Sequence, residues 1–207
     1  MQVFPYKLYL VVSEEACRGR DILWVTEQAV KGGVDLVQLR EKQKSVAEFT
    51  ALAIRLKVLL DNYNVPLIIN DNVEVAIAVG AHGVHVGNSD MPPSHIKQLW
   101  PDCPLLGYSI EHLEQLSGTE VHYADHLGIS PVFSTPTKTD TVTEWGLDGI
   151  TQIRILTDKP LVAIGNVNAT NARAVMKAGA DCLAVVSAIC AADDPRQAAI
   201  DILSAIK

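Results

Sequence analysis

The stretch KGGVDLVQLR at residues 31–40 shares its pattern with two others, AVGAHGVHVG at 78–87 and KAGADCLAVV at 177–186. In each, a glycine ends a helical pattern, where it tolerates a left-handed backbone, and a run rich in Val and Leu follows. These glycines, Gly33, Gly80 and Gly179, are 47 and 99 positions apart. In a chain of 207 residues, eight βα units of about 26 residues each would make these gaps roughly two and four units.

Short apolar runs recur along the whole chain, mostly continuous, as expected of a parallel sheet that is covered on both faces. The eight runs cover residues 8–12, 35–40, 66–70, 83–87, 104–109, 126–130, 160–165 and 181–187. Helical patterns lie between them, and we expect helices over 22–31, 46–60, 73–79, 93–100, 110–116, 146–156, 170–178 and 195–206. The helix over 46–60 begins with a capping box of Ser45 and Glu48.

This alternation predicts a single (β/α)8 TIM barrel that occupies residues 1–207 as one domain. A doubly wound open sheet is the alternative, but it normally has fewer strands and carries a nucleotide-binding fingerprint. Neither G-x-G-x-x-G after the first strand nor G-x-x-x-x-G-K-[ST] is present.

Composition excludes several classes of protein. Hydrophobic residues make up 48% and charged residues 20%, which is typical of a globular chain. The net charge of −7 argues against binding to nucleic acid or to an anionic membrane. We find no signal peptide, no membrane-spanning run and no metal-ligand spacing of histidines. The four cysteines form no CxxC pair, so we expect reduced thiols in a cytoplasmic protein. We expect a monomer or a homodimer.

Polar residues at the strand ends are the candidate site, because a barrel carries its chemistry at the carboxyl ends of its strands. In the second run, Gln38, Arg40 and Lys42 share the face opposite Val37 and Leu39. Pointing inward near the mouth, these donors predict an anion site. The alternative is a rim salt bridge between Arg40 and Glu41.

Carboxylates follow the third and fourth runs. Asn70 and Asp71 end the third, and Asp90 lies in the loop after the fourth. Either carboxylate could be only an N-cap. Together, from neighbouring strands, Asp71 and Asp90 could hold one divalent cation through oxygen ligands, as Mg²⁺ prefers.

The remaining strand ends predict phosphate binding. Ser109 ends the fifth run, and the loop after the sixth contains Thr135, Thr137 and Lys138, whose hydroxyl and ammonium groups suit an anion. Gly165 and the pair Val186–Ser187 end the last two runs, where many barrels bind phosphate through backbone N–H groups. We therefore expect small substrates that carry two separate phosphorylated groups.

The motifs together resemble the thiamine-phosphate synthase family over essentially the whole chain. They are QLREK at 38–42, IND at 69–71, GVHVGxxD at 83–90, PVFSTPTK at 131–138 and AGAD from Ala178, in the family's order. The resemblance implies a (β/α)8 transferase that joins an aminopyrimidine-methyl pyrophosphate to a thiazole phosphate and releases pyrophosphate.

The resemblance also implies a role for each site residue. Gln38 would hold the pyrimidine ring, and Mg²⁺ would be the cofactor, held by Asp71 and Asp90. The pyrophosphate would be bound by Arg40, Lys42, Asn70, Ser109 and Lys138, of which Arg40, Lys42, Ser109 and Lys138 are the expected catalytic residues. Thr135 and Thr137, with backbone at Gly165, Val186 and Ser187, would bind the thiazole phosphate.

Some positions depart from the family pattern. Asn166 stands in place of a second glycine after the seventh run, Ser130 in place of a glycine, and Asn88-Ser89 where Gln-Glu is common. Glu111 occupies a slot where the family often has histidine. A related barrel, the thiazole tautomerase, uses a histidine there, so Glu111 favours the synthase. The alternatives are the tautomerase and a catalytically silent barrel that binds thiamine intermediates.

Overall fold

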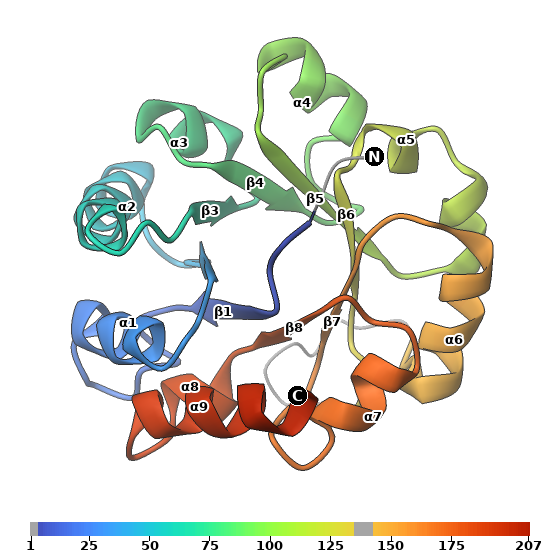
Figure 1. The fold of residues 1–207 in the computed structure, drawn as a ribbon. Helices are drawn as coiled ribbons and strands as arrows, with labels where there is room; N and C mark the ends of the chain where they lie inside the picture. Colours follow the sequence, from blue (N-terminus) through green and yellow to red (C-terminus); the bar gives the residue numbers. More distant parts are fainter. Residues whose placement is uncertain (1–3, 135–142) are drawn as a thin grey trace.

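All eight apolar runs form parallel strands, and these close into one barrel in the computed structural model, which describes residues 4–134 and 143–207 (Figure 1). The strand order follows the sequence, and β1 pairs with β8, with Leu8 opposite Leu183. The strands are β1 (Leu8–Val12), β2 (Leu36–Leu39), β3 (Leu67–Asn70), β4 (Gly83–Val86), β5 (Leu105–Ile110), β6 (His126–Ile129), β7 (Leu161–Ile164) and β8 (Cys182–Val185). The predicted (β/α)8 barrel is confirmed.

Helices surround the barrel, as Figure 1 shows; most connect successive strands, and α8 and α9 follow the last strand. They are α1 (Ile22–Lys31), α2 (Val46–Asp61), α3 (Val73–Ala78), α4 (Pro93–Leu99), the 3₁₀ helix η1 (Leu113–Ser117), α5 (Glu120–Tyr123), α6 (Gly146–Leu156), α7 (Ala172–Lys177), α8 (Ser187–Cys190) and α9 (Pro195–Ile206). The capping box of Ser45 and Glu48 is present. The glycines at the three repeated junctions, Gly33, Gly80 and Gly179, all have positive φ.

Strand alternation divides the core into two layers. Val37 and Leu39 of β2 belong to the large cluster between strands and helices. Leu36, on the opposite face, belongs with Tyr9 and Ile68 to a smaller cluster inside the barrel. A barrel of eight strands has an interior that side chains fill, so this inner layer supports the polar residues above it.

The helix expected over 110–116 was the main error of the sequence-based prediction. Ile110 instead ends β5, and the connection to β6 consists of η1 and the single turn α5. Two smaller differences are that α7 is shorter than 170–178 and that a short helix, α8, follows β8 at once. In a one-turn helix few apolar residues repeat at helical spacing, so the periodic signal is weak.

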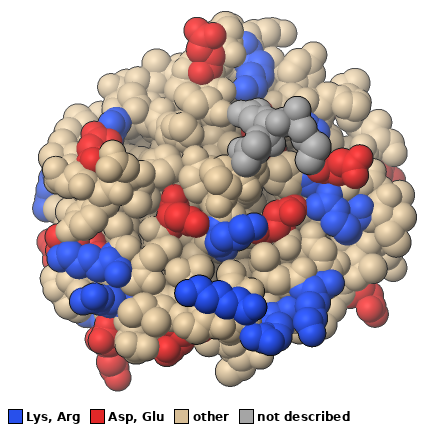
Figure 2. All heavy atoms as spheres, viewed as in Figure 1, with Lys and Arg blue, Asp and Glu red and all other residues tan. Residues whose placement is uncertain are grey.

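Charge is mixed on the face seen in Figure 2, where Lys and Arg side chains lie among Asp and Glu side chains. The described residues on that face therefore form no continuous basic surface of the kind that binds nucleic acid. Over residues 4–134 and 143–207, no helix combines the length and the apolar character that crossing a bilayer requires.

Candidate active site

Gln38 points into the barrel from β2, as the alternation predicts. It is 4% exposed, and its Nε2 donates a hydrogen bond of 2.8 Å to Tyr9 Oη. Arg40 follows where β2 ends and is half-buried, with its backbone N–H bonded to Val12 O. Its guanidinium makes no ion pair within the described part of the chain, while Glu41 accepts from the backbone N–H of Glu14. The alternative salt bridge between Arg40 and Glu41 is therefore wrong.

Lys42, Asp71 and Asp90 come together at the mouth of the barrel. The ammonium of Lys42 contacts the carboxylate of Asp71. Burial raises the pKa of Asp71, Lys42 opposes this rise, and the adjacent Asp90 carboxyl group raises it further. Asp71 also has φ of 61°, a left-handed conformation that costs energy for a residue with a Cβ and often marks a functional site.

Neither carboxylate is the helix cap that the sequence left open. Asn72 caps α3, because its side chain accepts from Val75 N at 2.9 Å. The first turn of α4 has no side-chain cap, and Asp90 Oδ2 instead accepts from Gly87 N at 2.8 Å. Both Asp71 and Asp90 are therefore directed to the loops at the mouth.

The two carboxylates fit a Mg²⁺ ion that is shared with a substrate. Adjacent carboxylates repel each other unless a proton or a cation lies between them. In the described residues no group of three or more His, Cys, Asp or Glu side chains could hold a metal. Mg²⁺ is usually bound by only one or two carboxylates, with waters and substrate phosphates as the other ligands. A site of two carboxylates beside a lysine meets that requirement.

Ser109 and Asn70 complete this side of the mouth. Ser109 Oγ lies 2.9 Å from His85 Nε2, and the backbone oxygen of His85 accepts from Asp71 N at 2.8 Å. Asn70 ends β3 and is 8% exposed, opposite His85 in the strand register. Strands β2 to β5 thus bring Gln38, Asn70 and Ser109 to one end of the barrel.

A buried histidine, His126, is not among the site residues that the sequence predicts. It is 0% exposed inside the barrel, its ring is 5.6 Å from that of His85, and neither ring nitrogen has a hydrogen-bond partner in the described residues. Burial lowers its pKa, and His85 lowers it further. Strand alternation could have predicted its position. Leu127 and Ile129 face the helices, so the period of two along a strand points His126 into the barrel.

Gly107 makes room for the two histidines. A Cβ at Gly107 would lie 2.2 Å from His85 Nδ1 and 2.5 Å from His126 Nε2. A Cβ at Gly128 would lie 2.9 Å from His85 Cε1. The absence of a side chain at Gly107 on β5 and at Gly128 on β6 therefore leaves the space that the two rings occupy.

Three of the predicted thiazole-phosphate residues, Gly165, Val186 and Ser187, are described and lie at the ends of β7 and β8. Gly165 follows β7 with φ of +115°, and a Cβ there would lie 2.6 Å from Pro131 Cβ, so both backbone and space require glycine. Its carbonyl accepts from Phe133 N at 3.2 Å, which joins the end of β7 to the loop after β6. Val186 and Ser187 lie where β8 passes into α8. Thr135, Thr137 and Lys138 lie outside the described residues.

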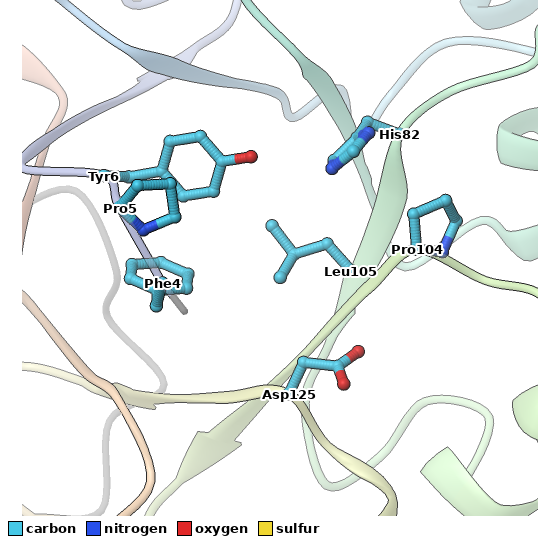
Figure 3. A pocket seen from close by; sticks show the side chains of 7 residues that line it. All are labelled: Phe4, Pro5, Tyr6, His82, Pro104, Leu105 and Asp125. Carbon is cyan, nitrogen blue, oxygen red and sulfur yellow. The ribbon is translucent and has the colours of Figure 1, made fainter. Parts of the chain in front are cut away.

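A cavity of about 160 Å³ lies at the opposite end of the barrel. Phe4 and Tyr6 line it from one side and Leu105 and His82 from the other, with Asp125 beside them (Figure 3). These residues precede or begin their strands, whereas the site residues follow theirs. The cavity is therefore not part of the candidate active site.

Comparison with known proteins identifies what the chain is similar to. The model of the thiamine monophosphate synthase family matches residues 8–189. The thiamine-phosphate synthase of Albidiferax ferrireducens is 50% identical over 94% of this chain and 89% of its own length. That of Vibrio parahaemolyticus is 45% identical over 96% of this chain and 97% of its own.

Solved structures give the same result. The thiamine phosphate pyrophosphorylase of Pyrococcus furiosus superposes with a TM-score of 0.87 at 33% identity, covering 97% of this chain and 95% of that one. A 3-hexulose-6-phosphate synthase superposes with a TM-score of 0.70 at 18% identity, over 97% of this chain and all of that one, which shows only the shared fold.

Proposed function

Because this chain belongs to the thiamine monophosphate synthase family, we propose that it joins an aminopyrimidine-methyl pyrophosphate to a thiazole phosphate and releases pyrophosphate. The observation that carries the proposal is the meeting of Lys42, Asp71 and Asp90 at the carboxyl ends of the strands. A pyrophosphate leaving group needs positive charge, and these residues supply one cation and two ligands for another.

The pyrimidine substrate would be held by the β2–β5 side of the mouth. Gln38 would orient the ring through its amide, and Asn70 and Ser109 would donate hydrogen bonds to the pyrophosphate. Arg40, Lys42 and Lys138 would stabilise the negative charge that grows on the pyrophosphate as the carbon–oxygen bond breaks. Asp71 and Asp90 would hold Mg²⁺, which when bound supplies further charge to the leaving group.

The thiazole phosphate would be anchored across the mouth by Thr135 and Thr137 and by backbone at Gly165, Val186 and Ser187. Holding its ring nitrogen near the pyrimidine methylene makes the attack effectively intramolecular. The aminopyrimidine delocalises the positive charge left on that carbon. No protein nucleophile takes part in this scheme, and the residues act by position and charge alone.

No observation favours the tautomerase. Glu111, at the position where that enzyme would need its histidine, accepts a hydrogen bond of 2.8 Å from Asn88 Nδ2. The proposal extends to a cytoplasmic protein, monomeric or homodimeric, in agreement with its four buried free cysteines.

The test is a coupled assay that measures thiamine phosphate and pyrophosphate from the two substrates, with Mg²⁺ and with excess EDTA. We expect both products in equal amounts, and only with the metal. Isomerised thiazole without pyrophosphate would identify a tautomerase instead, and substrate binding without product would identify a binding protein. Activity that survives EDTA would remove Mg²⁺ from the proposal.

A further inference from the structure

Gln115 joins the two loops that carry the proposed ligands Asp90 and Ser109. It lies in η1, just after β5. Its Oε1 accepts hydrogen bonds from the backbone N–H of Glu111 at 2.7 Å and of His112 at 2.9 Å. One end of the amide therefore fixes the turn that follows Ser109.

The other end of the same amide reaches across to the loop after β4. Gln115 Nε2 donates to Asn88 Oδ1 at 2.7 Å and to the backbone oxygen of Ser109 at 3.2 Å. Tyr108 Oη donates to the same Asn88 oxygen at 2.5 Å and lies 3.2 Å from Gln115 Nε2. Asn88 Nδ2 then donates to Glu111, which closes the network.

The network contacts both halves of the pyrophosphate site. Asn88 lies between Gly87 and Asp90, whose own contact at 2.8 Å closes the loop that presents the Asp90 carboxylate. Ser109 is held at its carbonyl by Gln115, while its Oγ lies beside His85. A shift of Gln115 would therefore move a proposed metal ligand and a proposed pyrophosphate ligand together.

Only a side-chain amide of this length serves both ends. At one end, the Oε1 atom must accept hydrogen bonds from two N–H groups. At the other end, the Nε2 atom must donate hydrogen bonds to two oxygens. A carboxylate at the second end would face the oxygens of Asn88 and Ser109 and repel them.

We propose that Gln115 is a positioning residue that couples Asp90 to Ser109 and thereby sets the affinity of the site for a magnesium–pyrophosphate group. The inference rests on the proposed function for the identity of that group. Gln115 acts through its neighbours and has no role in binding the thiazole phosphate.

The experiment uses the purified full chain with two substitutions. Gln115→Met keeps the length of the side chain and loses both the acceptor oxygen and the donor nitrogen. Gln115→Glu keeps an acceptor oxygen and loses the donor nitrogen. Titration with inorganic pyrophosphate in Mg²⁺ should give a Kd raised about tenfold in both variants, the loss expected for one or two hydrogen bonds. The KM of the pyrimidine pyrophosphate should rise equally, and that of the thiazole phosphate should stay unchanged. Gln197→Met is the matched control, because the exposed side chain of Gln197 donates to Asp201 on α9, far along the chain from the site, and its loss should change neither constant.

Asn88→Ala removes the other end of the same hydrogen bond and takes the place of Gln115→Met if that variant does not fold. Combined with Gln115→Glu, it should add little to the loss of pyrophosphate affinity, because coupled residues are not additive. A pyrophosphate Kd within twofold of wild type in both Gln115 variants would overturn the inference. So would equal rises in both KM values, which a merely structural role produces. A wild-type chain that binds pyrophosphate but makes no thiamine phosphate would contradict the proposed function alone, since the titration still tests Gln115.

Discussion

Individual residues inside the barrel are placed by strand alternation, and the same rule gives different results for different residue types. It predicted from the sequence that Gln38 points inward, and in the structure Gln38 donates a hydrogen bond to Tyr9. It applies equally to His126, whose nitrogens have no partner in the described residues. An inward polar residue is therefore foreseeable from sequence, whereas the partner it meets depends on the register between strands.

His126 should make folding stability depend on pH. Its pKa is lowered in the folded state by burial, so protonation favours the unfolded chain, where the ordinary value is 6.5. The contribution of neutral His126 to the unfolding free energy is fully present above pH 6.5. Below that pH the unfolding free energy falls, by up to about 1.4 kcal/mol per pH unit. Urea unfolding between pH 8 and pH 5 should show this decline, and it should be smaller in His126→Phe.

The exposed His122 provides the control variant, His122→Gln, which should keep the full pH dependence of the wild type. Wild-type unfolding free energies that stay constant from pH 8 to pH 5 would contradict the role given to His126.

Lys138 lies outside the described residues, and its role is a prediction from the sequence. Its ammonium is expected to stabilise the departing pyrophosphate, so Lys138→Ala should lower kcat about 100-fold or more. The thermal unfolding midpoint should change little. Steady-state kinetics and a melting curve check this, with Lys31→Ala on α1 as the control. Near-normal kcat in Lys138→Ala would remove the residue from the mechanism.

At the scale of elements, the sequence predicted the helices and strands that hydrophobic periodicity and capping residues specify. It did not predict the elements that lack both signals. The helix over 146–156 has its expected limits because its apolar residues repeat at helical spacing. The segment after β5 lacks that repeat, and its conformation comes from side-chain bonds of Gln115 to backbone groups. The same amide also bonds Asn88, in the loop after β4 and 27 positions away, and hydrophobic periodicity describes neither kind of contact.

The glycine on β5 is an element-scale feature with a testable effect. Gly107→Ala would place a methyl group 2.2 Å from His85 Nδ1, so the ring must shift, and this disturbs its contact with Ser109 Oγ. We expect a loss of about 1–3 kcal/mol in unfolding free energy from overpacking, together with weaker pyrophosphate binding. Urea titration and pyrophosphate titration measure the two effects.

Gly19→Ala separates steric clash from backbone effects, since nothing lies within 4 Å of the added Cβ although φ is positive. It should reduce stability by only about 1 kcal/mol and leave pyrophosphate binding unchanged. An unfolding free energy of Gly107→Ala that equals the wild-type value would show that the two histidines move aside for the methyl group without cost.

At the scale of the whole molecule, closure of the barrel brings together residues that the sequence keeps apart. Lys42 and Asp71 are 29 positions apart yet in contact, because β2 and β3 are neighbours in register. Strand order alone predicted that these residues share one end of the barrel. The left-handed backbone of Asp71 required the three-dimensional structure, because it depends on how the loop after β3 packs.

The chain's net charge of −7 should slow the approach of anionic substrates, whereas the cations expected at the mouth should speed it. At physiological salt, charges more than about 8 Å away are largely screened, so Arg40, Lys42 and Lys138 should dominate over the distant acids. With Mg²⁺ saturating, kcat/KM for the pyrimidine pyrophosphate should therefore fall about two- to fivefold as KCl rises from 50 to 300 mM. Lys42→Ala should flatten this dependence. A kcat/KM that rises with salt would instead mean that the overall negative field controls the approach of the substrate.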